Sequence, residues 1–323
     1  MSFSRWRTFL FAYIVLTFAL YNAQAFCAVT LDQTGPFAQE SPALALDFDP
    51  SLYKTEREQL WCLKGRAFAT QNKFDRAQIF LAKALAQNSQ SPVHYWIGLA
   101  HENQARQWLK VWHKNLKSSG AGKEKKYFRK KKTTVIDLEQ IKDELKKAFS
   151  HYAICADMFP DYSPLSYHAA RTAIFQLNDL AKAEKYLDSA LSLQPEEPLY
   201  LNLRAEYFLR LKRFADARKD AETCALEDPS NAARALSHLM IGRIELEQQN
   251  FTKAVEEISR SLDLNQEPSS GYYYLALGHL GLRQDEHALA DYEKFLADSP
   301  RTLDLAELQQ TAIADYRRIK NIH

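Results

Sequence analysis

The sequence has 323 residues, a length that would suggest two domains in a globular protein. Only nine of them are glycine, under 3% against a usual ~7%, which disfavours folds rich in hairpin turns and favours an all-α chain. Forty-two basic and forty acidic residues leave a net charge of +2, so overall charge does not single out nucleic acid or a membrane as a partner.

The first 25 residues have the composition of a signal peptide. Two arginines precede the 13-residue apolar run Phe9–Tyr21, and Ala23-Gln24-Ala25 fits a small-x-small cleavage site. The run is short for a transmembrane helix. We therefore expect an exported chain cleaved after Ala25. An uncleaved anchor and lipidation at Cys27 are alternatives, the second disfavoured by the bulky Phe26.

Residues 26–57 form an extended leader. Pro36, Pro42 and Pro50 interrupt this part of the chain, and its apolar residues show little helical or strand periodicity. We expect it to lead onto the first regular element without forming a domain of its own.

The stretch Pro198–Asn231 is a 34-residue unit of two helices. Its apolar residues recur at helical spacing in two groups, which are Leu201, Ala205 and Phe208, then Phe214, Ala217, Ala221 and Cys224. A polar turn separates the groups, and Asp228-Pro229 ends the second helix. Two helices this short cannot cover their own apolar faces, so the unit needs a copy of itself on either side.

Copies of this unit occur in phase along the chain. With Pro198 as position 1, bulky residues fall at positions 4, 11 and 17 and small residues at 8, 20 and 27. The same frame gives units one to six at residues 58–90, 91–163, 164–197, 198–231, 235–268 and 269–302. The pattern resembles the tetratricopeptide repeat family. The resemblance implies a right-handed α-α superhelix of about six helix–turn–helix units, and analogy with exported members implies a periplasmic location.

Unit two is interrupted. Its first helix fits 91–103 and its second resumes near Ala148, so about 38 residues are inserted at about 104–141. Apolar residues at helical spacing flank the insert on both sides, and Thr134 with Asp137 could form a capping box for the returning helix. We expect an arm that protrudes from the superhelix.

The insert is strongly basic. Residues 106–132 hold one acid and eleven basic side chains, a local charge of +10, namely Arg106, Lys110, Lys114, Lys117, Lys123, Lys125, Lys126, Arg129, Lys130, Lys131 and Lys132. Such a segment suits an anionic membrane surface or polymer. Nucleic acid is a weaker candidate because an exported protein rarely meets it. The alternative is a solvated tip that keeps a long insert soluble.

Residues 303–323 are expected to form a capping helix with a polar outer side. The first helices of the units should line the concave groove of the superhelix, where we expect a partner peptide or helix to bind. The predicted groove residues are Arg66, Tyr95, Glu102, Asn103, His168, Asn202, Glu206, Arg210, Arg243 and Tyr273. The C-terminal part of this face is apolar (Leu236, Leu239, Leu246, Leu277 and Leu280), unless the terminal helix covers these leucines itself.

Catalytic and metal-binding signals are weak. His101-Glu102 begins a zinc-protease motif, but Ala105 stands where the second histidine should be. Cys155 and Cys224 occupy the small, buried position of a second helix, and Cys62 lies on a first helix; we expect all three to be small core residues. We therefore expect no cofactor or metal, no enzymatic activity, and a scaffold or adaptor role in assembling a cell-envelope complex; the alternative is a peripheral binder of anionic membrane through the basic arm.

Overall fold

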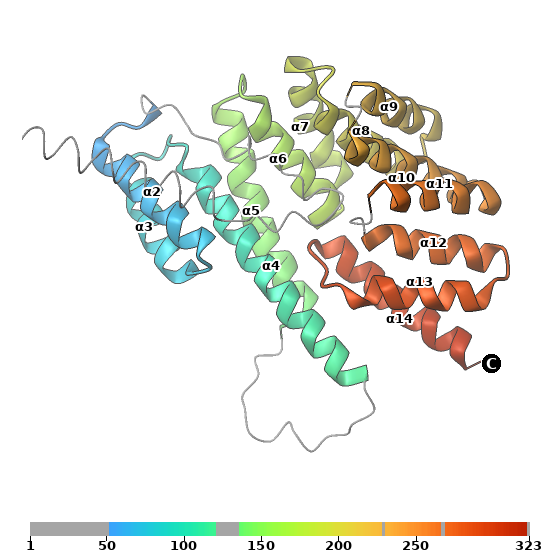
Figure 1. Ribbon diagram of the computed structural model, residues 1–323. Coiled ribbons are helices and arrows are strands. Elements are labelled where there is room, and N and C mark those ends of the chain that lie inside the picture. The colour runs from blue at the N-terminus through green and yellow to red at the C-terminus, as the bar shows by residue number, and fades with distance from the viewer. Residues whose placement is uncertain (1–51, 121–135, 228–229, 266–268, 322–323) are drawn as a thin grey trace, which may run out of the picture.

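The computed structural model describes residues 52–120, 136–227, 230–265 and 269–321 (Figure 1). The predicted signal peptide, most of the leader and residues 121–135 of the basic insert lie outside these ranges. The described elements are all helical, which confirms the all-α prediction. They are α2 (Glu56–Thr70), α3 (Phe74–Gln87), α4 (Val93–Gly120), α5 (Leu138–Met158), α6 (Ser163–Thr172), η3 (Ala173–Leu177), α7 (Leu180–Leu193), α8 (Pro198–Arg210), α9 (Phe214–Glu227), α10 (Asn231–Glu247), α11 (Phe251–Leu264), α12 (Ser269–Gly281), α13 (Asp285–Ala297) and α14 (Leu303–Lys320).

The turn inside each regular unit has one conformation. Position 15 is left-handed in units one, three, four, five and six, at Asn72, Asn178, Lys212, Gln249 and Arg283, with φ between 52° and 62°. In four of these units the next backbone N–H bonds to the carbonyl five residues earlier, at 2.8–2.9 Å, which closes the first helix. In unit three the π-helical turn η3 lengthens this bond to six residues. The turn therefore comes from backbone geometry, without glycine.

Small residues at position 8 allow the two helices of a unit to touch. A Cβ atom added to Gly65 would lie 2.5 Å from Leu81, and one added to Gly242 would lie 2.5 Å from Ile258. Real carbon atoms do not approach so closely, so a larger side chain would push the paired helices apart. Glycine or alanine occupies this position in every unit except unit three, which has Arg171.

Unit two lacks the turn. Its position 15 is Ala105, which lies within the 28-residue helix α4, and the returning helix α5 has 21 residues. The two run side by side away from the superhelix (Figure 1). α5 begins with a capping box made by Asp137 and Gln140, so the predicted box of Thr134 with Asp137 is wrong: Asp137 is the N-cap and not the third residue of the helix.

Helix α14 lies on the inner side of the superhelix. The N–H of Leu303 donates to the Gln176 side-chain oxygen at 2.9 Å, across 127 residues of sequence. Gln309 contacts His113 of α4 at 2.9 Å, and Ala306 packs with Leu109 of α4. The C-terminal half of α14 packs on α12 and α13. The terminal helix therefore bridges units two, three and six, in addition to covering the last unit.

Candidate functional site

The inner face was predicted to expose ten side chains, and the structure buries six of them. Arg66, Asn103, Arg210 and Arg243 are partly exposed. The buried ones are Tyr95, Glu102, His168, Asn202, Glu206 and Tyr273. Buried side chains cannot contact a partner directly, so this part of the predicted groove is corrected: these six belong to the internal packing of the superhelix.

A buried carboxylate joins units two and three. Glu102 is fully buried and accepts from Arg171 of α6 at 2.5 Å, Arg106 at 2.9 Å and the hydroxyl of Tyr152 at 2.8 Å. Burial alone would raise the pKa of Glu102, but the guanidinium groups of Arg171 and Arg106 outweigh it and hold the pKa well below its usual range. Glu102 is therefore an ionised structural group.

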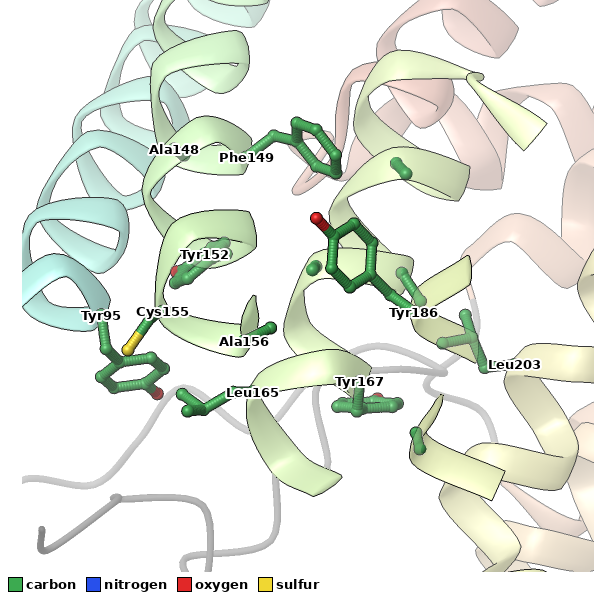
Figure 2. Packing of buried hydrophobic residues seen from close by; sticks show 14 of the residues in the cluster. Tyr95, Ala148, Phe149, Tyr152, Cys155, Ala156, Leu165, Tyr167, Tyr186 and Leu203 are labelled. Atoms are coloured by element: carbon green, nitrogen blue, oxygen red, sulfur yellow. The ribbon is translucent and has the colours of Figure 1, made fainter. Parts of the chain in front are cut away.

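Aromatic side chains surround this carboxylate. Tyr95, Tyr152 and His168 form a cluster with ring centroids 5.3–5.7 Å apart. Figure 2 shows Cys155 pointing toward Tyr95 in the same core. Burial raises the pKa of Cys155 to about 12, so it is an inert packing group. Cys62, Cys155 and Cys224 are all buried, which confirms that they are small core residues.

A second buried carboxylate joins units three, four and five to α14. Glu206 accepts from Arg210 at 2.7 Å and from both terminal nitrogens of Arg243, at 2.5 and 3.1 Å. Arg210 also donates to the Ile174 carbonyl at 2.9 Å and to Asp304 of α14 at 3.1 Å. Burial opposes ionisation of Glu206, but its two arginines lower the pKa to about 2. Arg210 thus holds the chain's own helix on the inner face, and Arg243 holds Glu206.

Helix α14 covers part of the apolar C-terminal end of the inner face. Leu277 and Leu280 pack in one cluster with Leu305 and Leu308 of α14. Leu239 and Leu246 pack within units five and six, and Leu236 is half-buried. The terminal helix therefore covers two of the five leucines, Leu277 and Leu280.

The open part of the inner face lies on units one and two. Arg66 is partly exposed and lies over the ring of Trp96, 4.6 Å from its centroid. Asn103 is partly exposed on α4. Further along α4, Lys110 and Lys114 are exposed. This surface is polar and basic.

The other basic-arm residues are not placed. The side chain of Lys117 and all of Lys123, Lys125, Lys126, Arg129, Lys130, Lys131 and Lys132 lie outside the described residues. Their role stays a prediction.

Histidine–acid pairs link the helices of three units, a feature that sequence reasoning missed. His101 contacts Glu144 at 2.5 Å, His238 contacts Glu257 at 2.7 Å and His279 contacts Asp291 at 2.8 Å. The sequence held a signal for such pairs. His101 and His279 both occupy position 11 of their units, and Glu257 and Asp291 both occupy position 23. Within the described residues no group of three or more His, Cys, Asp or Glu side chains could hold a metal ion. The pairs therefore act as interhelical contacts.

Comparison with known proteins gives one family. Models of the tetratricopeptide repeat match residues 58–90, 172–235 and 239–301. None of the curated proteins matches the sequence. Among the helices of the described ranges, none has the length and apolar character needed to cross a membrane.

Solved structures share the fold at low sequence identity. A tetratricopeptide repeat protein from Parabacteroides merdae has a TM-score of 0.55 at 14% identity, covering 83% of this chain and 93% of that one. The type IV pilus biogenesis factor PilW has 0.50 at 12%, covering 80% and 99%. The anaphase-promoting complex assembly Cut9–Hcn1 has 0.50 at 17%, covering 79% of this chain but only 42% of that chain. These likenesses show a superhelical repeat fold.

Proposed function

Because this chain belongs to the tetratricopeptide repeat family, whose members typically bind other proteins, we propose that it is a non-enzymatic scaffold for a partner protein. We place the partner site on the open inner face of units one and two. The observation that supports this site is the division of the inner face: α14 occupies the part around Arg210 and packs on Leu109 and His113 of α4, whereas Arg66, Asn103 and Lys110 keep exposed surface. This narrows the ten-residue groove predicted from sequence to its N-terminal part.

The chemistry of this surface favours an acidic partner segment. Arg66, Lys110 and Lys114 carry positive charge on adjacent first helices, and the exposed amide of Asn103 can pair with a peptide backbone. Charge complementarity of this kind raises the association rate and selects partners of opposite sign. An extended or helical peptide with two or three carboxylates would fit it.

The expected place of action is a cell-envelope assembly. The N-terminal segment has the pattern of an export signal, and the fold resembles that of a pilus biogenesis factor. Fold likeness alone does not carry function, so the envelope role rests mainly on export. Secretion of a reporter fused to residues 1–30 would test it; a reporter that stays in the cytoplasm would contradict it.

Charge reversal on the open face tests the partner site. We expect Arg66→Glu with Lys110→Glu to reduce the yield of co-purified partner proteins at least tenfold, while Lys219→Glu, an exposed residue of α9, leaves it unchanged. Circular dichroism and thermal unfolding check that the variants fold. Retention of every partner by the double variant would exclude this surface. Arg210 and Arg243 are unsuitable as probes because both hold the buried Glu206, and Arg210 also holds α14.

The second candidate is binding of an anionic membrane by the basic arm. It is favoured by Lys110 and Lys114, which are exposed on the helix that leads into the insert. Each basic residue near such a surface contributes about 1 kcal/mol. Charge reversal of Lys130, Lys131 and Lys132 should then abolish co-sedimentation with phosphatidylglycerol vesicles at low salt. Substitution is preferable to deletion from Lys110, because deletion would remove the contact of His113 with α14.

A further inference from the structure

Each unit stacks on the one before it through three positions of its first helix. Positions 3, 6 and 10 face the preceding unit, as shown by the ring of Tyr200 stacked on Tyr167 at 5.3 Å and by Met240 and Ile244 packed with Ala205. In units two to six every one of these residues is buried except Tyr274, which is half-buried. They are Val93, Trp96 and Ala100; Ser166, Ala169 and Ala173; Tyr200, Leu203 and Tyr207; Ser237, Met240 and Ile244; and Gly271, Tyr274 and Gly278.

The first unit leaves the same positions uncovered by the described chain. They are Leu60, Leu63 and Ala67 of α2, and the two leucines are 48% and 50% exposed. A terminal repeat normally carries polar residues on its outer face, because no neighbour covers it. α2 instead presents a surface suited to stacking, which indicates an occupant other than the described residues.

The charges beside this surface select the occupant. Arg57 lies over the ring of Trp61 at 4.8 Å, and Lys64 and Lys83 lie over the ring of Phe80 at 5.7 and 5.5 Å. Glu56, one turn before Leu60, is the exposed acid of this helix, so basic groups outnumber it around the leucines. A second copy of the chain, stacked face to face, would bring these like charges together. An acidic, apolar segment would complement them.

The leader has this chemistry and the right attachment. Residues 26–51 contain four acids (Asp32, Glu40, Asp47 and Asp49) and no lysine, arginine or histidine. Its last part, 43–49, reads ALALDFD and holds three large apolar side chains, Leu44, Leu46 and Phe48, beside two acids. It joins the described chain at residue 52, four residues before α2 begins. Covalent attachment this close gives it a high effective concentration at the α2 surface.

We propose that residues 43–49 dock on Leu60, Leu63 and Ala67 and act as the N-terminal cap of the superhelix. The apolar side chains of Leu44, Leu46 and Phe48 supply the contact that a preceding unit would supply elsewhere, and Asp47 and Asp49 meet the basic border.

Thiol labelling of α2 tests this cap. The full-length chain carries Leu63→Cys with Cys27→Ser; Cys62, Cys155 and Cys224 are at most 1% exposed and do not react in the folded protein. The reference is Leu226→Cys, at a leucine that is 80% exposed on α9. We expect Leu63→Cys to react at least tenfold more slowly than Leu226→Cys, and the substitutions Leu44→Ser, Leu46→Ser and Phe48→Ser to restore fast labelling.

The other outcomes overturn the proposal. Labelling of Leu63→Cys at the reference rate would mean that the face is open, and protection lost on hundredfold dilution would mean that a second copy covers it. Protection that survives the three leader substitutions would assign the face to another occupant. A disulfide formed by oxidation of Phe48→Cys with Leu63→Cys, but not with Leu226→Cys, gives independent support. Partner binding by the open inner face is measured separately, so the two proposals fail independently.

Discussion

Two ionised glutamates, Glu102 and Glu206, are buried in the interior of the superhelix, and each is bonded to two arginines. Removing one partner of such a group leaves an unpaired buried charge, which typically costs about 3–5 kcal/mol. Glu102 and Glu206 connect neighbouring units where apolar packing alone would allow small changes of angle. We regard them as the groups that set the position of one unit on the next.

The pKa of Glu206 predicts an acid-sensitive stability. It is about 2 in the folded chain and near its ordinary value of 4.5 in the unfolded chain, so its contribution is complete above about pH 4.5 and is lost as the pH falls toward 2. The shift corresponds to about 3 kcal/mol. Between pH 6 and pH 3, urea unfolding should therefore lose markedly more stability in the native chain than in Glu206→Gln. Equal losses would contradict the ionised pair.

His151 predicts a second loss, at higher pH. Burial, followed by the neighbouring His94 and His101, lowers the pKa of His151 to about 4, below its ordinary 6.5. Because the folded form binds its proton less readily, stability is complete above about pH 6.5 and falls as the pH drops toward 4. Allowing for partial exposure, we expect a loss of about 1–2 kcal/mol. His151→Gln should flatten the pH 7 to pH 5 part of the stability curve and leave the steeper acid part unchanged.

Residues that follow the repeat could be predicted from sequence, and residues that link units could not. Cys155 and Cys224 occupy a repeat position that demands a small buried side chain, and the structure buries both. Arg171 stands at a position where other units have glycine or alanine, and its role depends on Glu102 lying on the facing unit. Nothing in the spacing of one unit specifies which side chain of another unit it will meet.

At the scale of the element, the left-handed residue of each turn is the point of backbone strain. A left-handed conformation costs a non-glycine residue about 1–2 kcal/mol. Asparagine tolerates it best, but Lys212, Gln249 and Arg283 have no such advantage. Their first helices end there because packing of the paired helix outweighs this cost.

Glycine at such a turn should stabilise the chain. Lys212 is exposed and left-handed, with φ 59°, so Lys212→Gly relieves the strain and loses no buried contact. After subtracting glycine's greater freedom in the unfolded chain, about 0.5–1 kcal/mol, we expect a gain of about 0.5–1 kcal/mol. The matched control Lys219→Gly, exposed within α9, should lose about 1 kcal/mol. Urea unfolding measures both, and a loss of stability in Lys212→Gly would contradict the strain.

The pairing of the helices could be predicted because the same spacing of bulky and small residues recurs in successive units. The start of α5 was placed wrongly because both Thr134 and Asp137 satisfy the local capping rule. The insert was correctly expected between helical flanks, and the structure adds that α4 continues through Ala105 without a turn. Local signals locate a helix end to within a few residues, and the tertiary partner decides the rest.

At the scale of the whole molecule, α14 changes what kind of repeat protein this is. In an open array each unit contacts only its neighbours, so stability and motion are local. Here α14 joins α4 and η3 to α12 and α13 through Leu303, Ala306 and Gln309. The sequence predicts a terminal capping helix, with packing of that helix on the inner-face leucines as an alternative. It leaves both open because an amphipathic helix does not specify which apolar surface it covers.

A charge placed under α14 should therefore destabilise unit two as well as α14. Ala306 is fully buried against α4 and α5, so Ala306→Glu places an unpaired carboxylate there and should weaken the docking of α14 by about 3 kcal/mol or more. Hydrogen exchange followed by mass spectrometry should show lost protection in residues 105–116 and 173–177 as well as in α14, while α2 and α3 stay protected. Gln310→Glu, exposed on the same helix, is the control and should change none of these segments. If Ala306→Glu loosens only α13 and α14, the helix is an ordinary terminal cap, and the superhelix behaves as an open array.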